Sequence, residues 1–178
     1  WDGEVKRAQE LGLTGYPVFT HKQHTDIAYL ACARKLLDAA DLIYPQFATH
    51  NAGTISAILQ MAQGRNAAFE FQRLHGMADG IYREVLATHP DLALRIYAPV
   101  GEHRDLLAYL VRRLLENGAN SSFVHQLTDE TVAPAELLAS PLARIDARPL
   151  PAPRDLYGRE RANATGADLA CLQDRAPL

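Results

Sequence analysis

Short apolar runs alternate with amphipathic stretches three times in the middle of this 178-residue chain. The apolar runs, each of the length of a buried strand, are residues 42–48, 69–75 and 94–100. The stretches with helical spacing that follow them are residues 53–63, 78–88 and 104–117. Strands that alternate with helices in this way are typical of βαβ units, whose strands run parallel. The alternation therefore predicts an α/β fold built on a parallel sheet.

Two architectures contain parallel strands of this kind, the doubly wound sheet and the (β/α)8 barrel. No helical stretch opens on a G-x-G-x-x-G fingerprint, which weakens the case for a dinucleotide-binding doubly wound sheet. Three strands cannot close a barrel, and a complete one needs about 250 residues. A barrel would therefore be present only as its second half. Pro45 and Pro99 should mark strand ends or bulges, because proline cannot donate to a strand ladder.

The two ends of the chain differ in character from its middle. Residues 2–11 predict a short helix, residues 15–20 a turn with an extended segment, and Thr25-Asp26 the N-cap of a helix over 27–40. Six of the ten prolines lie in the last 48 residues, and residues 147–154 are typical of an extended linker. We therefore divide the chain into a barrel part, 1–124, and a Pro-rich extension, 125–178. Because the chain begins at Trp1 without an initiator Met, we expect it to be cut from a longer protein.

The composition is that of an ordinary water-soluble domain. The formal net charge is −3, so no basic excess points to nucleic acid. No apolar run approaches the roughly 20 residues that span a bilayer. Cys32 and Cys171 are far apart and outside metal-ligand spacing, and Cys32 is expected to be a buried helix residue. Nothing here requires an oxidising compartment, so a cytoplasmic location is favoured.

The last of the three helical stretches has an unusual polar face. Tyr109, Arg112, Arg113 and Glu116 share that face, opposite a stripe formed by Leu107, Leu110, Val111 and Leu114. Gly118 stands where a left-handed C-cap is expected. Two guanidiniums beside a phenol suit a carboxylate, because arginine presents rigid paired donors. A solvated face opposite a packed leucine stripe gives the same pattern.

Polar residues also follow the predicted strands, at the edge where parallel α/β folds place their chemistry. Thr49, His50 and Asn51 follow the first strand, and His75 ends the second. The two histidines could be metal ligands, although the sequence shows no H-x-H pair and no Asp at a third strand end. The three residues after the first strand could instead bind phosphate or ribityl groups, or cap the next helix. Lys22, in residues 20–26, suits an anionic cofactor but also an ordinary exposed loop.

Residues 44–51, 69–77, 95–101 and 109–123 strongly resemble the flavin-dependent proline dehydrogenase domain of bacterial proline utilization A. Residues 151–158 resemble the segment that follows this domain, ahead of an aldehyde dehydrogenase domain. The resemblance implies the second half of a distorted (β/α)8 TIM barrel. It also implies FAD as the cofactor, oxidation of L-proline to Δ1-pyrroline-5-carboxylate by hydride transfer, and transfer of electrons to a ubiquinone-type acceptor.

The resemblance assigns roles to particular residues. It implies that Arg112 and Arg113 bind the proline carboxylate, and that Tyr97, Tyr109 and Leu74 enclose the proline ring. It implies FAD contacts for Thr20, Lys22, Thr49, His50, Asn51, Leu74, Glu116, Ser122, Phe123 and Trp1. It implies no metal ligands. The helix with the two arginines is expected to lie over the barrel mouth.

The chain also departs from the family pattern. The earlier barrel strands, with the family's substrate-facing lysine and aspartate, and the aldehyde dehydrogenase domain are absent from the sequence. We therefore expect half an active site, inactive alone, whose partners are the missing half of the barrel, the aldehyde dehydrogenase domain and a quinone. Peripheral association with the inner membrane stays open. The alternatives are a non-catalytic barrel fragment without cofactor and a metal-dependent barrel hydrolase.

Overall fold

The computed structural model describes residues 2–119, 122–144, 150–161, 167, 169–170 and 172–177. The chain forms two compact units, one made of residues 1–25 and 144–178 and the other of residues 26–143. No helix in the described ranges has both the length and the apolar character needed to cross a membrane.

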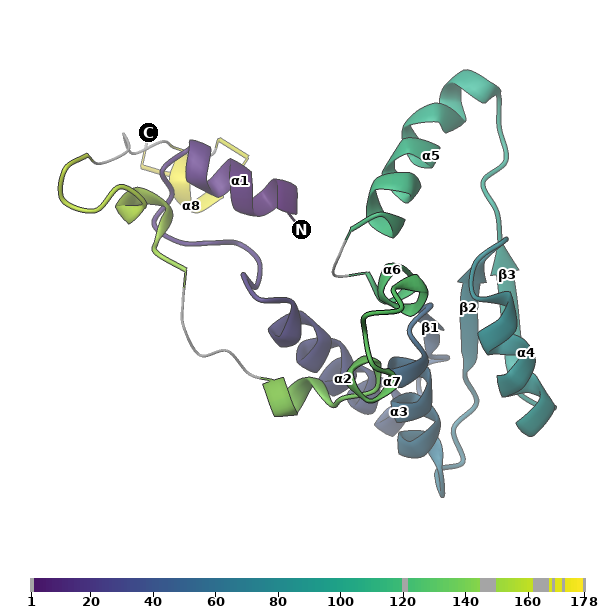
Figure 1. Cartoon of the computed structure of the whole chain (residues 1–178). Coiled ribbons are helices and arrows are strands. Elements are labelled where there is room, and N and C mark those ends of the chain that lie inside the picture. Colours follow the sequence, from purple (N-terminus) through teal and green to yellow (C-terminus); the bar gives the residue numbers. More distant parts are fainter. Residues whose placement is uncertain are drawn as a thin grey trace. The chain divides into compact units, whose positions relative to one another are not determined.

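The second unit is built on a parallel three-stranded sheet in the order β1-β2-β3 (Figure 1). The strands are β1 (Gln46–Ala48), β2 (Glu70–Leu74) and β3 (Ala93–Tyr97). Both neighbouring pairs are parallel, which confirms the predicted α/β fold with a parallel sheet. The strands are shorter than the apolar runs. Pro45 precedes β1 and Pro99 follows β3, as expected of a residue that cannot donate to the ladder.

The helices between and after the strands lie close to their predicted positions. They are α3 (Ala52–Ala62), α4 (Asp79–Thr88) and α5 (His103–Asn117). Three further short elements follow α5, namely α6 (Phe123–Thr128), α7 (Pro134–Leu137) and the 3-10 turn η1 (Pro141–Arg144). The prediction for α2 (Lys22–Asp38) was wrong at its start, because the helix begins before the expected cap at Thr25-Asp26. The intervening residues include no helix breaker, so the helix extends back to Lys22.

The two faces of the sheet differ sharply. Phe47, Phe71 and Leu94 are register partners and therefore share one face. The fully buried part of the core on this face also takes residues from α2, α3 and α4, namely Ala33, Leu37, Ile55, Ile58 and Tyr82. The other face carries the polar side chains of Gln46, Glu70, Gln72 and Arg95, with Leu74 and Tyr97 at its carboxyl end. Helices on one face and inward-pointing side chains on the other are the arrangement of a barrel wall, whereas a doubly wound sheet has helices on both faces.

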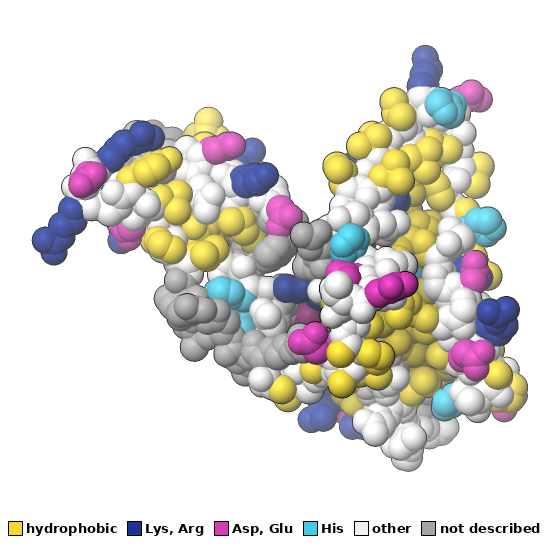
Figure 2. Space-filling view, viewed as in Figure 1, with side chains coloured by type: hydrophobic (Ala, Val, Ile, Leu, Met, Phe, Trp, Pro, Cys, Tyr) yellow, Lys and Arg dark blue, Asp and Glu magenta, His cyan; other side chains and the backbone are white. Residues whose placement is uncertain are grey.

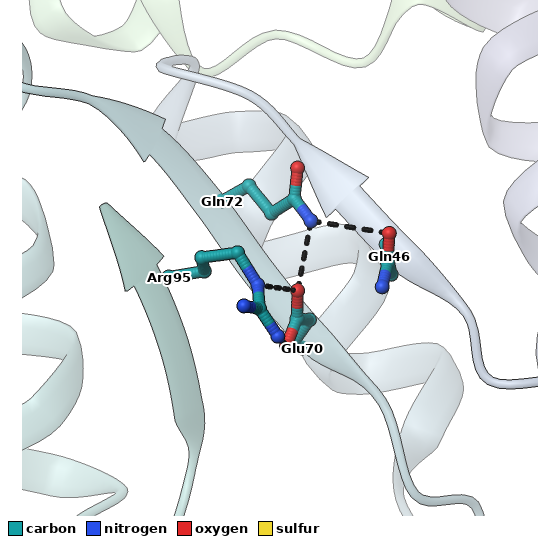
Figure 3. A network of polar contacts seen from close by, with 4 residues as sticks. All are labelled: Gln46, Glu70, Gln72 and Arg95. Carbon is teal, nitrogen blue, oxygen red and sulfur yellow. Dashed lines mark hydrogen bonds and ion pairs between the residues drawn. The ribbon is translucent and has the colours of Figure 1, made fainter. Parts of the chain in front are cut away.

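A polar network crosses all three strands on the second face (Figure 3). The Arg95 guanidinium holds both carboxylate oxygens of Glu70, at 2.6 and 2.9 Å. Gln72 Nε2 donates to the same carboxylate at 2.8 Å and to Gln46 Oε1 at 3.2 Å. The hydrogen bonds from Arg95 and Gln72 lower the pKa of Glu70 to about 2. Glu70 is thereby fixed as a charged carboxylate at the amino end of β2, and sequence reasoning gave it no role.

The packing expected of α5 was wrong. Every residue of this helix is exposed or half-buried, and Leu114 in the leucine stripe is 72% exposed. Figure 2 shows these apolar side chains in yellow along the helix. Gly118 caps the helix with φ −80°, in right-handed rather than left-handed conformation. Cys32, expected to be buried, is exposed on α2. Both helices have the predicted apolar spacing, but an apolar side chain is buried only where another element packs against it.

The first unit brings the two ends of the chain together. It contains α1 (Asp2–Glu10), the 3-10 turn η2 (Pro153–Asp155) and α8 (Leu172–Arg175). Tyr16 Oη donates to the Pro151 carbonyl at 3.0 Å, and Pro153 is fully buried. In the described part of the expected linker, Pro153 is thus packed into the unit, while Leu150, Pro151 and Arg154 are exposed. Residues 145–149 lie outside the described residues.

Candidate functional site

Polar side chains gather at the carboxyl edge of the sheet, beyond the ends of β1 and β2. His50 Nε2 accepts a hydrogen bond from the Leu74 amide at 3.0 Å, so the residues after β1 lie directly beside the end of β2. The His75 amide in turn donates to the Tyr97 carbonyl at 2.8 Å, which ties β2 to the end of β3. The predicted proximity of the first two strand ends is confirmed.

The backbone of the turn Thr49–Asn51 is held from several sides. The Thr49 amide donates to the Gln72 carbonyl at 3.3 Å, and its own carbonyl accepts from Tyr82 Oη at 2.8 Å. The Asn51 amide donates to Thr49 Oγ1 at 3.2 Å. Asn51 Oδ1 accepts from the Thr54 amide at 3.1 Å and caps α3, so the capping interpretation of Asn51 is confirmed.

These bonds leave a particular set of atoms for a ligand. In the part of the chain that the structure describes, no protein acceptor pairs with the Thr49 hydroxyl hydrogen, His50 Nδ1 or Asn51 Nδ2. Each of the three can donate: the Thr49 hydroxyl and the Asn51 amide nitrogen carry hydrogens, and Nδ1 carries the proton of the neutral His50 ring because Nε2 accepts from the Leu74 amide. We call this set the donor turn. It matches an oxygen-rich ligand at the N-terminus of α3, where backbone N–H groups also favour anions.

His50 is held as a neutral imidazole. Its Nε2 accepts a hydrogen bond, so the proton of the neutral ring is on Nδ1. Burial lowers the pKa of His50 below its ordinary value of 6.5; Glu116 opposes this effect, and Arg113 and Arg73 add to it. The ring therefore presents a donor, rather than a cation, beside the last turn of α5.

The last turns of α5 face the strand ends. Arg113 Nη1 pairs with Glu116 Oε2 at 2.6 Å, and the Arg113 guanidinium lies 5.4 Å from the centre of the Tyr109 ring. Arg113 Nε is buried and has no hydrogen-bond partner among the residues that the structure describes. Burial raises the pKa of Tyr97, the last residue of β3; the Tyr109 phenol adds to this rise and Arg113 opposes it. Arg113 and Tyr109 are therefore close neighbours, and both act electrostatically on the Tyr97 phenol at the end of β3.

Arg112 occupies a different position. Successive residues of a helix lie about 100° apart around its axis, so Arg112 and Arg113 need not act on one side. Arg112 lines a shallow groove along α5 with Leu107, Val111 and other residues of that helix. The structure thus brings one of the two predicted carboxylate ligands to the strand ends, and Arg112 remains on an exposed flank.

The remaining predicted residues lie as follows. Leu74, at the end of β2, is 8% exposed beside His50. Ser122 is at the N-cap position of α6, and Phe123 is the first residue of that helix. Thr20 and Lys22 belong to the first unit, where Lys22 begins α2 instead of lying in the expected loop. Trp1 lies outside the described residues.

Sequence reasoning missed two residues that shape this edge. Arg73, at 11% side-chain exposure, pairs with Asp79 Oδ1 at 2.5 Å and donates to the Met77 carbonyl at 3.2 Å. It thereby fastens the loop between β2 and α4. Tyr82 reaches from α4 to the Thr49 carbonyl. The acidic Asp79 in the first turn of α4 was the one sequence feature from which an ion pair with Arg73 could have been inferred. The sequence around Tyr82 indicated only an ordinary core position.

The structure gives no support to the interpretation of His50 and His75 as metal ligands. Among the described residues, no group of three or more His, Cys, Asp and Glu side chains is placed to hold a metal ion.

The fold and this edge define a class of protein. A sheet with helices on one face, and chemistry at the carboxyl ends of its strands, is part of a TIM-barrel type fold. The proline dehydrogenase family model matches residues 1–126, and the chain belongs to that family.

Several of the relatives found are named bifunctional protein PutA. The chain is 52% identical to the bifunctional protein PutA of Klebsiella aerogenes, a match that covers 96% of the chain and 14% of that protein. It is 48% identical to PutA of Rhizobium meliloti, over 100% of the chain and 15% of that protein. A crystal structure of a Bradyrhizobium japonicum proline utilization A mutant superposes with TM-score 0.90 at 53% identity, over 99% of the chain and 19% of that protein. The resemblance and the barrel-type fold are thus confirmed, and the chain spans about one seventh of the length of its curated relatives.

Proposed function

We propose that this chain provides the carboxylate-binding helix and one side of the flavin site of an FAD-dependent proline dehydrogenase. The observation that carries the proposal is the placement of Arg113, Tyr109 and Tyr97 together at the carboxyl edge of a barrel-type sheet. Membership of the proline dehydrogenase family supports it. A 53% identical neighbour solved with proline bound in remote sites adds support for proline as the ligand class.

The substrate proposal rests on complementary chemistry. L-proline has a carboxylate and an apolar ring, and Arg113 lies beside two aromatic rings. The unpaired N–H of Arg113 leaves a donor that its pair with Glu116 does not use. Arg112 would complete the clamp from the exposed flank, and Tyr97, Tyr109 and Leu74 would enclose the ring.

The residues present fit FAD. The donor turn offers three donors to the hydroxyl, carbonyl and phosphate oxygens of such a cofactor, next to the N-terminus of α3. Within the second unit, Glu116, Ser122 and Phe123 join the donor turn in the set that we assign to FAD. The resemblance to the family separately implies FAD contacts for Thr20, Lys22 and Trp1. When bound, FAD supplies the acceptor for the hydride that leaves the proline ring. The protein residues bind and orient, and no side-chain nucleophile is required.

We further propose that the complete site needs more strands than the three described in this chain. A (β/α)8 barrel closes with eight strands, and the sheet has three. The rest of a longer bifunctional chain would provide them, together with an aldehyde dehydrogenase domain. Residues 125–178 would then lead from the barrel part, 1–124, toward that domain. A ubiquinone-type acceptor would receive the electrons, in a cytoplasmic enzyme that can associate peripherally with the inner membrane.

The test of substrate binding is made in the flavoenzyme that contains this sequence. Arg113→Met and Arg112→Met should each raise KM for proline at least about tenfold, because a charge-assisted hydrogen bond is worth about 1.5–3 kcal/mol. Arg34→Met, at an exposed position on α2, is the matched control and should leave KM unchanged. Unchanged KM values for both α5 variants would mean that this helix face is only a solvated surface and does not bind the substrate.

A second measurement separates the catalytic proposal from that of a barrel fragment without cofactor. The 178-residue chain is mixed with FAD, and its absorbance is followed on addition of proline. We expect no proline-dependent bleaching from this chain alone, and bleaching once the remaining strands are supplied. Bleaching by the chain alone would contradict the proposal that its site is incomplete.

A further inference from the structure

Tyr82 is the fully buried residue beneath the donor turn. Its side chain is 1% exposed, and its ring centre lies 6.0 Å from that of Phe71 in the core. It belongs to α4, yet its hydroxyl leaves the core and donates to the Thr49 carbonyl at 2.8 Å. A buried tyrosine hydroxyl normally finds a partner, and here the partner is the backbone of the turn itself.

The hydrogen bond comes from outside the segment that it holds. The other bonds of the turn come from β2 or from the turn and α3 themselves. Tyr82 is the link to α4, whose first turn is fastened by the Arg73–Asp79 pair. Burial raises the pKa of the Tyr82 phenol well above its ordinary value of 10.0, so its proton stays available for donation.

We propose that Tyr82 is a positioning residue, whose hydroxyl holds the Thr49 carbonyl and thereby sets the direction of the three donors that receive the flavin. This inference rests on the proposed function. Tyr82 itself touches no ligand in this assignment, because its hydroxyl is engaged by Thr49. Its effect passes through the backbone of residues 49–51 to the Thr49 hydroxyl, His50 Nδ1 and Asn51 Nδ2.

The experiment compares FAD affinity in the complete flavoenzyme. Tyr82→Phe keeps the ring against Phe71 and removes the donor. We expect the FAD dissociation constant to rise about fivefold, the size of one lost hydrogen bond, while KM for proline at saturating FAD stays within about twofold. Tyr16→Phe is the matched control, because it also removes a phenol-to-carbonyl hydrogen bond, to Pro151, and should leave FAD affinity unchanged.

A rescue distinguishes positioning from simple loss of stability. The amino analogue 4-aminophenylalanine at position 82 restores a donor, so FAD affinity should return toward that of the wild type. If Tyr82→Phe yields no folded enzyme, 4-fluorophenylalanine at position 82 removes the donor while filling the same space, and the same titration applies. An unchanged FAD dissociation constant in a folded donor-free variant would overturn the positioning role. A wild-type enzyme that binds no flavin would overturn the proposed function instead.

Discussion

The donor turn after β1 and the helix α5 lie at the same edge of the sheet but are held in opposite ways. The turn is fastened by hydrogen bonds from β2, from α4 and from its own residues. In α5, no side chain is buried, and contacts such as Asn117 Nδ2 to Met77 Sδ at 3.7 Å connect it to the rest of its unit. The turn is therefore preorganised within this sequence, whereas α5 has an apolar face without a cover among the described elements. In a site made of both parts, the hydrogen bonds of the sheet and α4 therefore fix the donor turn, whereas α5 is held less firmly within this chain.

The largest change in the free energy of unfolding should come from a substitution in the core under the donor turn. Phe71→Ala removes a fully buried ring that packs against Phe47 and Tyr82, and should lower the free energy of unfolding by roughly 3–5 kcal/mol. Urea unfolding of the purified chain, followed by circular dichroism, measures this loss. A loss below about 1 kcal/mol would mean that the sheet core is not the stable part of the molecule.

The capping bond of the turn should matter less, but measurably. Asn51→Ala removes the side-chain acceptor for the Thr54 amide and should cost about 1 kcal/mol of unfolding free energy. Asn66→Ala, at an exposed loop position, serves as the control and should change nothing beyond about 0.5 kcal/mol. Equal effects of the two substitutions would contradict the assignment of Asn51 as a cap that matters for stability.

The neutral His50 gives the turn a pH dependence. Its pKa is lower in the folded protein than its ordinary value of 6.5, so the unfolded chain binds more protons as the pH falls below that value. Stability should therefore decrease as the pH falls from 6.5 toward the folded pKa, and this contribution levels off below it.

The pH profile of His50→Gln isolates this contribution, since the variant keeps the other titrating groups. The difference between wild type and variant should change between pH 6.5 and the folded pKa of His50. The pKa of the Glu70 carboxylate falls from 4.5 to about 2 on folding, so its own contribution changes between these pH values and is the same in wild type and variant. A difference that stays constant below pH 6.5 would mean that His50 is not held neutral.

The smallest effect should come from the stripe on α5. Leu114 is 72% exposed, so Leu114→Ala should change the free energy of unfolding of this chain by no more than about 0.5 kcal/mol. The measurement is the same urea titration as for Phe71→Ala. A loss comparable to that of Phe71→Ala would show that α5 packs as firmly as the sheet and would remove the contrast between the two regions.

Local sequence patterns predicted much of the second unit. The helices α3, α4 and α5 lie within a residue or two of their predicted starts, because amphipathic spacing and the preceding turns act locally. The start of α2 was missed, since a plausible cap at Thr25-Asp26 competed with good helix formers before it. At the site, helical spacing predicted that Tyr109 and Arg113 share a face of α5, whereas the role of Tyr97 beside them was implied only by the family resemblance. Arg112 is about 100° around the helix from Arg113, and only the position of α5 beside the strand ends decided which of the two arginines lies next to them.

By itself, the sequence determined the order of strands and helices, their parallel arrangement and the presence of polar residues at the strand ends, because these depend on local periodicity and short connections. Only the tertiary structure decided which atoms of those residues remain for a ligand. The Tyr82–Thr49 bond, the His50–Leu74 bond and the Glu70–Arg95 pair each join segments more than 20 residues apart. Such contacts arise when distant segments pack together, and the same packing left the leucine stripe of α5 exposed although its spacing predicts burial.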